Sequence, residues 1–169
     1  MGNNASPEAL AVQWADICND PLLRDLPYKI ELNAWGKIEM SPASNRHGRF
    51  QFVIGTELQS QLADGFVITE ASILTDIGVR VPDVVWASAA FVAAHGDVTP
   101  YPRAPEICVE VVSPSNFAGE IAEKTRAYLA AGAVEVWIAA EDGSIRYFDN
   151  NGQRAGSGFP VTIRPLKPL

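Results

Sequence analysis

The amino-acid sequence predicts an α/β fold in which helices flank a mixed central sheet, with a further helix and a hairpin near the N-terminus. Apolar runs typical of strands occur between segments whose apolar residues recur at helical spacing, in the order β-β-α-β-β-β-α-β-β. The chain has 169 residues, enough for one hydrophobic core, and it contains no internal repeat or linker. We therefore expect a single domain over residues 1–169.

The first third of the chain predicts two helices separated by a hairpin. Residues 7–18 carry apolar side chains at helical spacing. Residues 28–33 alternate in polarity, and after a turn the chain returns over 37–40, which is typical of a hairpin. Residues 41–65 contain a second helix, which Ser44 or Asn45 can cap and which Gly65 ends.

The centre of the chain predicts two strands joined by a tight turn, over residues 66–74 and 79–88. Residues 89–96 form a short helix or a loop, and 97–105 carry three prolines and form a loop.

The last third predicts the centre of the sheet. Residues 103–116 contain a strand that is apolar on both faces, as in a buried strand. A turn with a helix cap at Ser113-Pro114-Ser115 leads to a helix over 120–132, and strands follow over 134–140 and 145–149.

Composition excludes several classes of protein. No apolar run approaches the roughly 20 residues that span a bilayer, and the N-terminus lacks the pattern of a secretory signal. Cys18 and Cys108 make no disulfide framework, so we expect a cytoplasmic protein. The chain has 2 histidines, too few for a His-rich zinc site. It also lacks the G-x-S-x-G, H-E-x-x-H and phosphate-binding glycine motifs.

The charge of the chain is acidic, with a formal net charge of −7. Nucleic-acid-binding proteins usually carry a basic stripe, and the sequence shows none. A local basic surface is still compatible with this charge if several residues gather at one end of the sheet: Arg46, Arg49, Arg80, Arg103, Lys124 and Arg126.

Three charged residues lie where packing alone would not place them. Asp83 follows Pro82 in an apolar run, and Glu110 lies inside the buried strand, where ionisation is costly. Lys124 lies on the helix after that strand, beside its apolar face. A strand followed by a packed helix brings Glu110 and Lys124 to the same end of the sheet.

Two carboxylates on neighbouring strands repel each other unless a cation lies between them. A divalent cation would neutralise Asp83 and Glu110, and a nearby lysine could orient or deprotonate the attacking water. This pattern indicates metal-assisted hydrolysis of a phosphodiester. Each residue also has a structural explanation: Asp83 could cap a turn, Glu110 could pair with a lysine or arginine, and Lys124 could be solvated.

Four stretches of the sequence resemble the Uma family of bacterial restriction endonucleases, in the PD-(D/E)XK nuclease superfamily. They are VPDVVW, PEICVEVVSPS, EKTRAYLAAGAVEVWIA and the earlier ELNAWGKIEMSPASNRHGR. The resemblance runs from about residue 28 to residue 152 and implies a restriction-endonuclease-like core over that range.

The resemblance also implies a site. Asp83 matches the PD aspartate and Glu110 the second metal carboxylate, with Mg²⁺ or Mn²⁺ as the cofactor and DNA as the substrate. The superfamily lysine normally lies two residues after the glutamate, where this chain has Val112. Lys124 matches a lysine that has moved to the helix.

Further polar residues are secondary candidates. Glu39 and His47 lie in the early stretch that resembles the family, and Glu70 lies on the strand expected to pair with the strand of Asp83. His47 could bind phosphate or help to cap its helix. Glu57 lies beside the apolar stripe of the same helix and ranks below the others.

Two functions of different classes follow from the sequence, and a third, another metal-dependent hydrolase that uses the same site, is also compatible with it. The first is a Mg²⁺-dependent endonuclease. The second is a catalytically decayed nuclease fold that acts as an oligomeric interaction module, which the acidic charge and Val112 favour. We expect a homodimer under either function, with Trp35 and Trp86 as candidate exposed aromatics at an interface.

Overall fold

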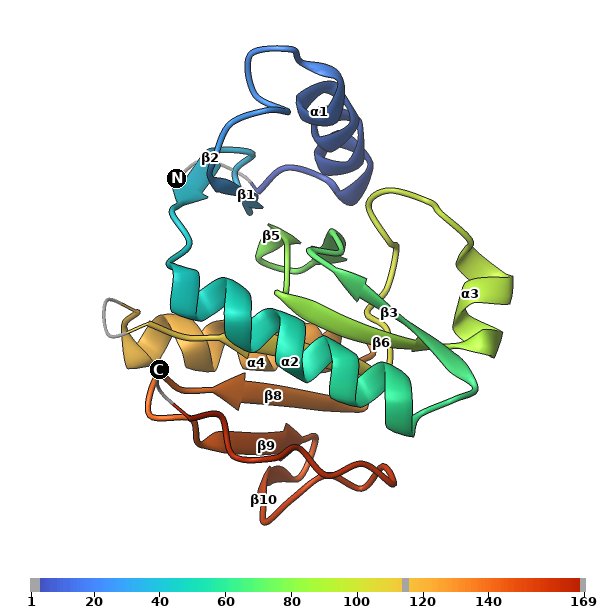
Figure 1. The fold of residues 1–169 in the computed structure, drawn as a ribbon. Helices are drawn as coiled ribbons and strands as arrows, with labels where there is room; N and C mark the ends of the chain where they lie inside the picture. The colour runs from blue at the N-terminus through green and yellow to red at the C-terminus, as the bar shows by residue number, and fades with distance from the viewer. Residues whose placement is uncertain (1–3, 114–115, 168–169) are drawn as a thin grey trace.

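The computed structural model describes residues 4–113 and 116–167 and shows a mixed α/β architecture with two sheets (Figure 1). The helices of this part of the chain are α1 (Pro7–Asn19), α2 (Asn45–Gln61), α3 (Ala89–His95) and α4 (Ala118–Ala130). Its strands are β1 (Lys29–Asn33), β2 (Ile38–Ser41), β3 (Gly65–Thr69), β4 (Ile73–Thr75), β5 (Gly78–Arg80), β6 (Val84–Ser88), β7 (Ile107–Val111), β8 (Glu135–Ala139), β9 (Ile145–Asp149) and β10 (Gly152–Arg154). None of the described helices is long and apolar enough to cross a membrane.

The large sheet has the strand order β10-β9-β8-β7-β6-β3. β7 and β8 are parallel and are joined through α4, whereas the other neighbours are antiparallel. Ile107, Val109 and Val111 face a core that also contains Phe50 and Ile54 of α2. The alternate residues of β7 face α3 and α4 on the other side of the sheet. Cys108 packs there in a second core with Phe91 of α3 and Tyr128 of α4.

The small sheet has the order β2-β1-β5-β4 and is antiparallel throughout. α1 covers one of its faces, because Leu10, Trp14 and Ile17 pack on Leu32 and Val79. The opposite face of β1 carries Lys29 and Glu31, since successive side chains of a strand alternate between faces. The small sheet therefore presents a charged face toward the rest of the molecule.

The two long strands predicted over residues 66–74 and 79–88 are each divided in the structure. β3 and β6 belong to the large sheet, whereas β4 and β5 belong to the small one. Glu70, expected on a strand, lies at the break with a φ of 54°. Pro82 lies at the break in the second strand, where its ring removes a backbone donor. Both arms of the hairpin thus run from the large sheet into the small one, and Asp83 lies where the second arm crosses between them.

Three smaller predictions also differ from the structure. β10 pairs with β9 where only a turn was expected. α4 begins after Phe117, which makes no side-chain cap, and residues 114–115 of the expected cap lie outside the described residues. Trp86, expected to be exposed, is only 7% exposed, and its indole N–H donates to the carbonyl of Leu62. Trp35 is exposed as expected.

Replacing Gly78 by alanine tests how strictly the small sheet is held in register. Gly78 pairs with Asn33 of β1 at a φ of 115°, and a Cβ there would lie 2.0 Å from the carbonyl oxygen of Leu32. We expect Gly78→Ala to lower the free energy of unfolding by about 2 kcal/mol in denaturant titrations. Gly48→Ala is the control, since a Cβ on this helical glycine meets nothing within 4 Å. It should raise the stability by about 0.5–1 kcal/mol. Equal effects of the two alanines would contradict this account.

Candidate active site

A cleft of about 730 Å³ lies between the small sheet and one end of the large sheet. Residues of β1 and β2 line one side, the start of α2 lines another, and the end of β7 with the first turns of α4 lines the third. Glu110 and Lys124 reach into this cleft, and so do Lys29 and His47. The charged face of β1 is therefore turned toward the residues that the sequence singled out.

Asp83 does not line the cleft itself but is buried behind two residues that do, Lys29 and His47, with 1% of its surface exposed. Its Oδ2 accepts a hydrogen bond of 2.7 Å from the backbone N–H of Val111. Its Oδ1 accepts one of 2.8 Å from Lys29 Nζ and lies 3.0 Å from His47 Nε2. Burial alone would raise the pKa of Asp83, but the charges of Lys29 and His47 outweigh it and lower the pKa to about 2. Asp83 is therefore an ionised carboxylate held in place by three donors.

Glu110 projects from β7 toward α4 and is 6% exposed. Its Oε1 accepts a hydrogen bond of 2.6 Å from the hydroxyl of Tyr128 and lies 3.5 Å from Lys124 Nζ. Lys124 and Tyr128 are four residues apart on α4, so both reach the same carboxylate. Burial raises the pKa of Glu110 above its ordinary value, although Lys124 and Lys29 oppose the rise. Asp83 and Glu110 are thus neighbouring carboxylates with pKa values displaced in opposite directions.

Lys29 contacts both carboxylates. Its Nζ lies 2.8 Å from Asp83 Oδ1 and 3.6 Å from Glu110 Oε2. Burial would lower the pKa of Lys29, but Glu110, Asp83 and then Glu31 raise it above its ordinary value. The ammonium form of Lys29 therefore links the two proposed metal carboxylates.

Lys124 links Glu110 to a further buried carboxylate, Glu31 of β1. Its Nζ lies 2.9 Å from Glu31 Oε2 and 3.5 Å from Glu110 Oε1. Burial would lower the pKa of Lys124, but these two carboxylates raise it. Burial would likewise raise the pKa of Glu31, but Lys124 and Lys29 lower it. Glu31 also accepts a hydrogen bond of 2.8 Å from the backbone N–H of Val81, which fixes its side chain.

Arg80 is the last cation of this network of charged side chains. Glu31 and Glu39 lie directly opposite each other on β1 and β2, where like charges are destabilising. Arg80 Nη1 contacts both carboxylates and offsets their repulsion. Carboxylates and cations therefore alternate through the site, in the order Asp83, Lys29, Glu110, Lys124, Glu31, Arg80 and Glu39.

The structure brings most of the candidates from the sequence into this one network. Asp83, Glu110 and Lys124 lie within it, and His47 contacts Asp83. Glu39 lies at the outer end, against Arg80. Two candidates lie elsewhere: Glu70 is exposed after β3, and Glu57 pairs with Arg164 of the C-terminal segment. Glu70 lies away from the network because the hairpin is divided between the two sheets. Glu57 lies away from it because it is three turns along α2 from the end of the helix that carries His47.

Lys29, Glu31 and Tyr128 join the network although the sequence did not single them out, and Arg80 was expected only as part of a basic surface. A signal for the first two exists in the stretch KIELN, where a lysine and a glutamate two residues apart share the polar face of a strand. Sequence alternation shows which face they share but not which residues that face meets. Tyr128 lies on the buried face of its helix, where a tyrosine needs no special role, and its hydroxyl contact with Glu110 arises only in the fold.

The donor set of the site fits a hard divalent cation. Asp83 and Glu110 each place an oxygen within 3.6 Å of the single Nζ of Lys29, so their carboxylates converge on one cation position. Among the described residues, no group of three or more His, Cys, Asp and Glu side chains is arranged to hold a metal. Hard divalent cations can be held by one or two carboxylates, so the pair of Asp83 and Glu110 is the donor set that the site offers.

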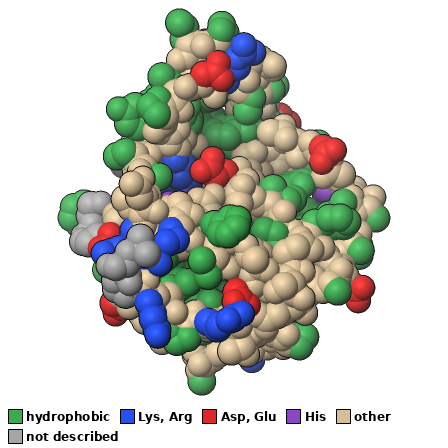
Figure 2. All heavy atoms as spheres, in the orientation of Figure 1, with side chains coloured by type: hydrophobic (Ala, Val, Ile, Leu, Met, Phe, Trp, Pro, Cys, Tyr) green, Lys and Arg blue, Asp and Glu red, His purple; other side chains and the backbone are tan. Residues whose placement is uncertain are grey.

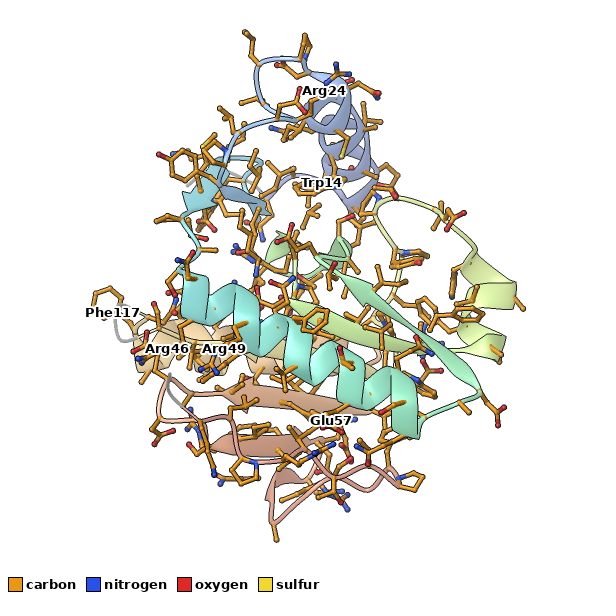
Figure 3. All side chains as sticks on the ribbon, in the orientation of Figure 1. Trp14, Arg24, Arg46, Arg49, Glu57 and Phe117 are labelled. Atoms are coloured by element: carbon orange, nitrogen blue, oxygen red, sulfur yellow. The ribbon has the colours of Figure 1, made fainter. Side chains whose placement is uncertain are left out.

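The basic residues considered from the sequence gather only in part. Figure 2 shows lysine and arginine side chains together beside the start of α2. Arg46 and Arg49 project there from the first turns of the helix (Figure 3), and Arg46 lies 3.4 Å from Glu141 at the cleft. Arg126 instead pairs with Asp76, and Arg103 packs beside Gly132. A short basic surface therefore borders one side of the cleft.

The chain is similar to a solved nuclease structure and matches one family model. It is similar to the crystal structure of a "putative nuclease belonging to DUF820 from Anabaena variabilis ATCC 29413", with a TM-score of 0.64, 15% identity, and coverage of 80% of this chain and 77% of that chain. The restriction-endonuclease-like fold expected from the sequence is confirmed. The Uma2 family model, described as "Putative restriction endonuclease", matches residues 20–161. This chain belongs to that family. No curated protein sequence matches it significantly.

The contact between His47 and Asp83 makes stability depend on pH. The hydrogen bond to Asp83 favours the imidazolium and raises the pKa of His47 above 6.5, its ordinary value. A raised pKa gives stability that is complete below that value and is lost as the pH rises through the folded-state pKa. We expect His47→Gln to unfold about 1 kcal/mol more easily than wild type at pH 6 and to differ less at pH 9, in urea titrations.

The control for this prediction is His95→Gln, which removes the other histidine, on α3 against Phe91 and Tyr101. A difference between wild type and His47→Gln that stays constant from pH 6 to pH 9 would refute the charge contribution.

Proposed function

We propose that this chain is a metal-dependent endonuclease that hydrolyses DNA phosphodiester bonds, with Asp83 and Glu110 as the carboxylates that hold Mg²⁺ or Mn²⁺. The observation that carries the proposal is the convergence of these two buried carboxylates on one cation position, now held by the ammonium of Lys29, at the cleft of a restriction-endonuclease-like fold. The names of the family and of the similar structure, a restriction endonuclease and a nuclease, support this choice of reaction.

The division of labour between the two carboxylates follows from their environments. Asp83 stays ionised, since three donors hold it and its pKa is about 2. Glu110 is the more basic of the pair, because burial raises its pKa. A divalent ion bound there would act as a Lewis acid toward the phosphate. His47 keeps Asp83 oriented through the 3.0 Å contact with its Oδ1.

Lys124 is the proposed catalytic lysine. Its raised pKa keeps it an ammonium, so its role is to donate hydrogen bonds to the reacting phosphate or to the attacking water rather than to remove a proton. Glu31 and Glu110 hold the ammonium at the wall of the cleft, 2.9 and 3.5 Å from their oxygens. A fixed donor of this kind stabilises charge that develops on the phosphate.

The acidic charge of the chain repels the phosphates of DNA, the proposed substrate. Phosphate contacts supply much of the affinity for nucleic acid, and the net charge of −7 opposes them. Arg46 lies at the edge of the cleft, where it pairs with Glu141, and offers a local positive charge that favours phosphate. The homodimer expected from the sequence stays a prediction.

The second candidate function is the catalytically decayed nuclease fold that serves as an interaction module. The ion pairs favour it, because Lys29, Lys124 and Arg80 already neutralise the carboxylates of the cleft. Measured metal binding separates the two candidates.

Titration with Mn²⁺ by calorimetry tests the metal site. We expect wild type to bind the ion and Glu110→Gln to bind it at least about tenfold more weakly, because the substitution removes one of two anionic ligands. Glu57→Gln is the matched control, since it removes a carboxylate that pairs with Arg164 outside the cleft.

Equal binding by wild type and Glu110→Gln would mean that the ion binds elsewhere. If wild type binds Mn²⁺ neither alone nor with DNA present, the interaction module becomes the better account.

Cleavage assays on single- and double-stranded DNA test the lysine. We expect Lys124→Met to lower the rate constant for cleavage at saturating Mn²⁺ by about 100-fold or more, since a fixed donor to developing charge is lost. Arg146→Met removes a cation from β9, where it lies over Phe148, and should cleave at the wild-type rate. A Lys124→Met enzyme of full activity would exclude this role.

A further inference from the structure

We propose that Lys29 is a built-in competitor for the metal: its ammonium holds Asp83 and Glu110 together at the cation position and is displaced when a divalent ion binds there. This inference rests on the proposed function, since it concerns the same two carboxylates. Lys29 is a positioning residue in this proposal, because it acts through the carboxylates rather than on the substrate.

The geometry of Lys29 supports this role. Its Nζ lies 2.8 Å from Asp83 Oδ1 and 3.6 Å from Glu110 Oε2, at the point where one cation contacts both carboxylates. Only 11% of its side chain is exposed, so the ammonium is enclosed with its partners. A divalent ion that coordinates the same two oxygens would have to take this position, because both cations cannot occupy it.

Electrostatics explains why a cation is held there at all. Asp83 and Glu110 come from neighbouring segments and are 1% and 6% exposed, so two unpaired carboxylates would repel each other in a poorly solvated place. Lys29 offsets this repulsion and keeps the carboxylates close. A more highly charged ion that binds both would offset it more strongly, and the ammonium would then no longer be needed between them.

A third carboxylate, that of Glu31, is available to the displaced ammonium. Glu31 lies two residues along β1 on the same face, and its charge already contributes to the raised pKa of Lys29. A rotation of the lysine side chain toward Glu31 would therefore vacate the cation position, and the buried ammonium would still lie beside a carboxylate.

Lys124 supplies the contrast. Its carboxylate partners are Glu110 and Glu31, and it approaches Glu110 from the side of α4. It therefore borders the cation position instead of filling it. Loss of Lys124 would remove a neighbouring charge but would leave Lys29 between Asp83 and Glu110.

The test compares Mn²⁺ affinity in the full chain by calorimetry at constant pH and ionic strength. We expect Lys29→Met and Lys29→Gln to bind Mn²⁺ at least about tenfold more tightly than wild type, because the competing ammonium is gone. Lys124→Met should bind it no more than about threefold more tightly, and Lys29→Arg, which keeps the cation, no more tightly than wild type.

Thermal unfolding provides a second readout that needs no activity. Without added metal, Lys29→Met should melt below wild type, because two buried carboxylates lose their shared partner. Saturating Mn²⁺ should raise its melting temperature by more than it raises that of wild type.

The outcomes separate this inference from the proposed function. If wild type binds Mn²⁺ and the Lys29 variants bind it equally or more weakly, the displacement is wrong and the metal site stands. The same conclusion follows if Lys29→Met and Lys124→Met gain affinity equally, since that would be a general effect of charge. If neither wild type nor any variant binds Mn²⁺, alone or with DNA present, the displacement and the metal site are both wrong.

Discussion

The burial of Asp83 beside Glu110 is the constraint on which the rest of the site depends. Two carboxylates that are almost inaccessible to water are strongly destabilising unless cations reach them, and the fold brings two lysines to do so. These lysines come from opposite sides: Lys29 from the small sheet and Lys124 from α4. The packing of both elements against the large sheet is therefore coupled to the charge balance of the cleft.

The same constraint explains why the molecule has two sheets that meet at a divided hairpin. Asp83 lies at the break, where its backbone N–H donates to the carbonyl of Val109 and its side chain accepts from the N–H of Val111. β5, which precedes Asp83 in the chain, pairs with β1. β1 in turn carries Lys29 and Glu31. The break that interrupts both strands thus brings Asp83 against Lys29 of the small sheet.

A cleft of alternating charges suits a reaction in which a cation and a polyanion must both enter. Ion pairs among its own residues keep the site folded and electrically balanced, while Asp83 stays ionised and Glu110 is made more basic by burial. Lys124 stays positively charged beside Glu110 and Glu31, since these carboxylates raise its pKa despite burial. Arg80 stays positively charged beside Glu31 and Glu39 for the same reason. The proposed site therefore combines two candidate carboxylate ligands for a cation with a lysine proposed to donate to a phosphate.

The sequence by itself determined the order of most helices and strands, and it singled out Asp83, Glu110 and Lys124. These features are local: hydrophobic periodicity reports the burial of a segment, and a charge inside an apolar run is visible without a structure. Only the tertiary structure decided that Lys29, Glu31 and Arg80 join them. Alternation in β1 defines a polar face, but the partner of that face lies 54 residues away at Asp83, and the division of the hairpin between two sheets brings them together.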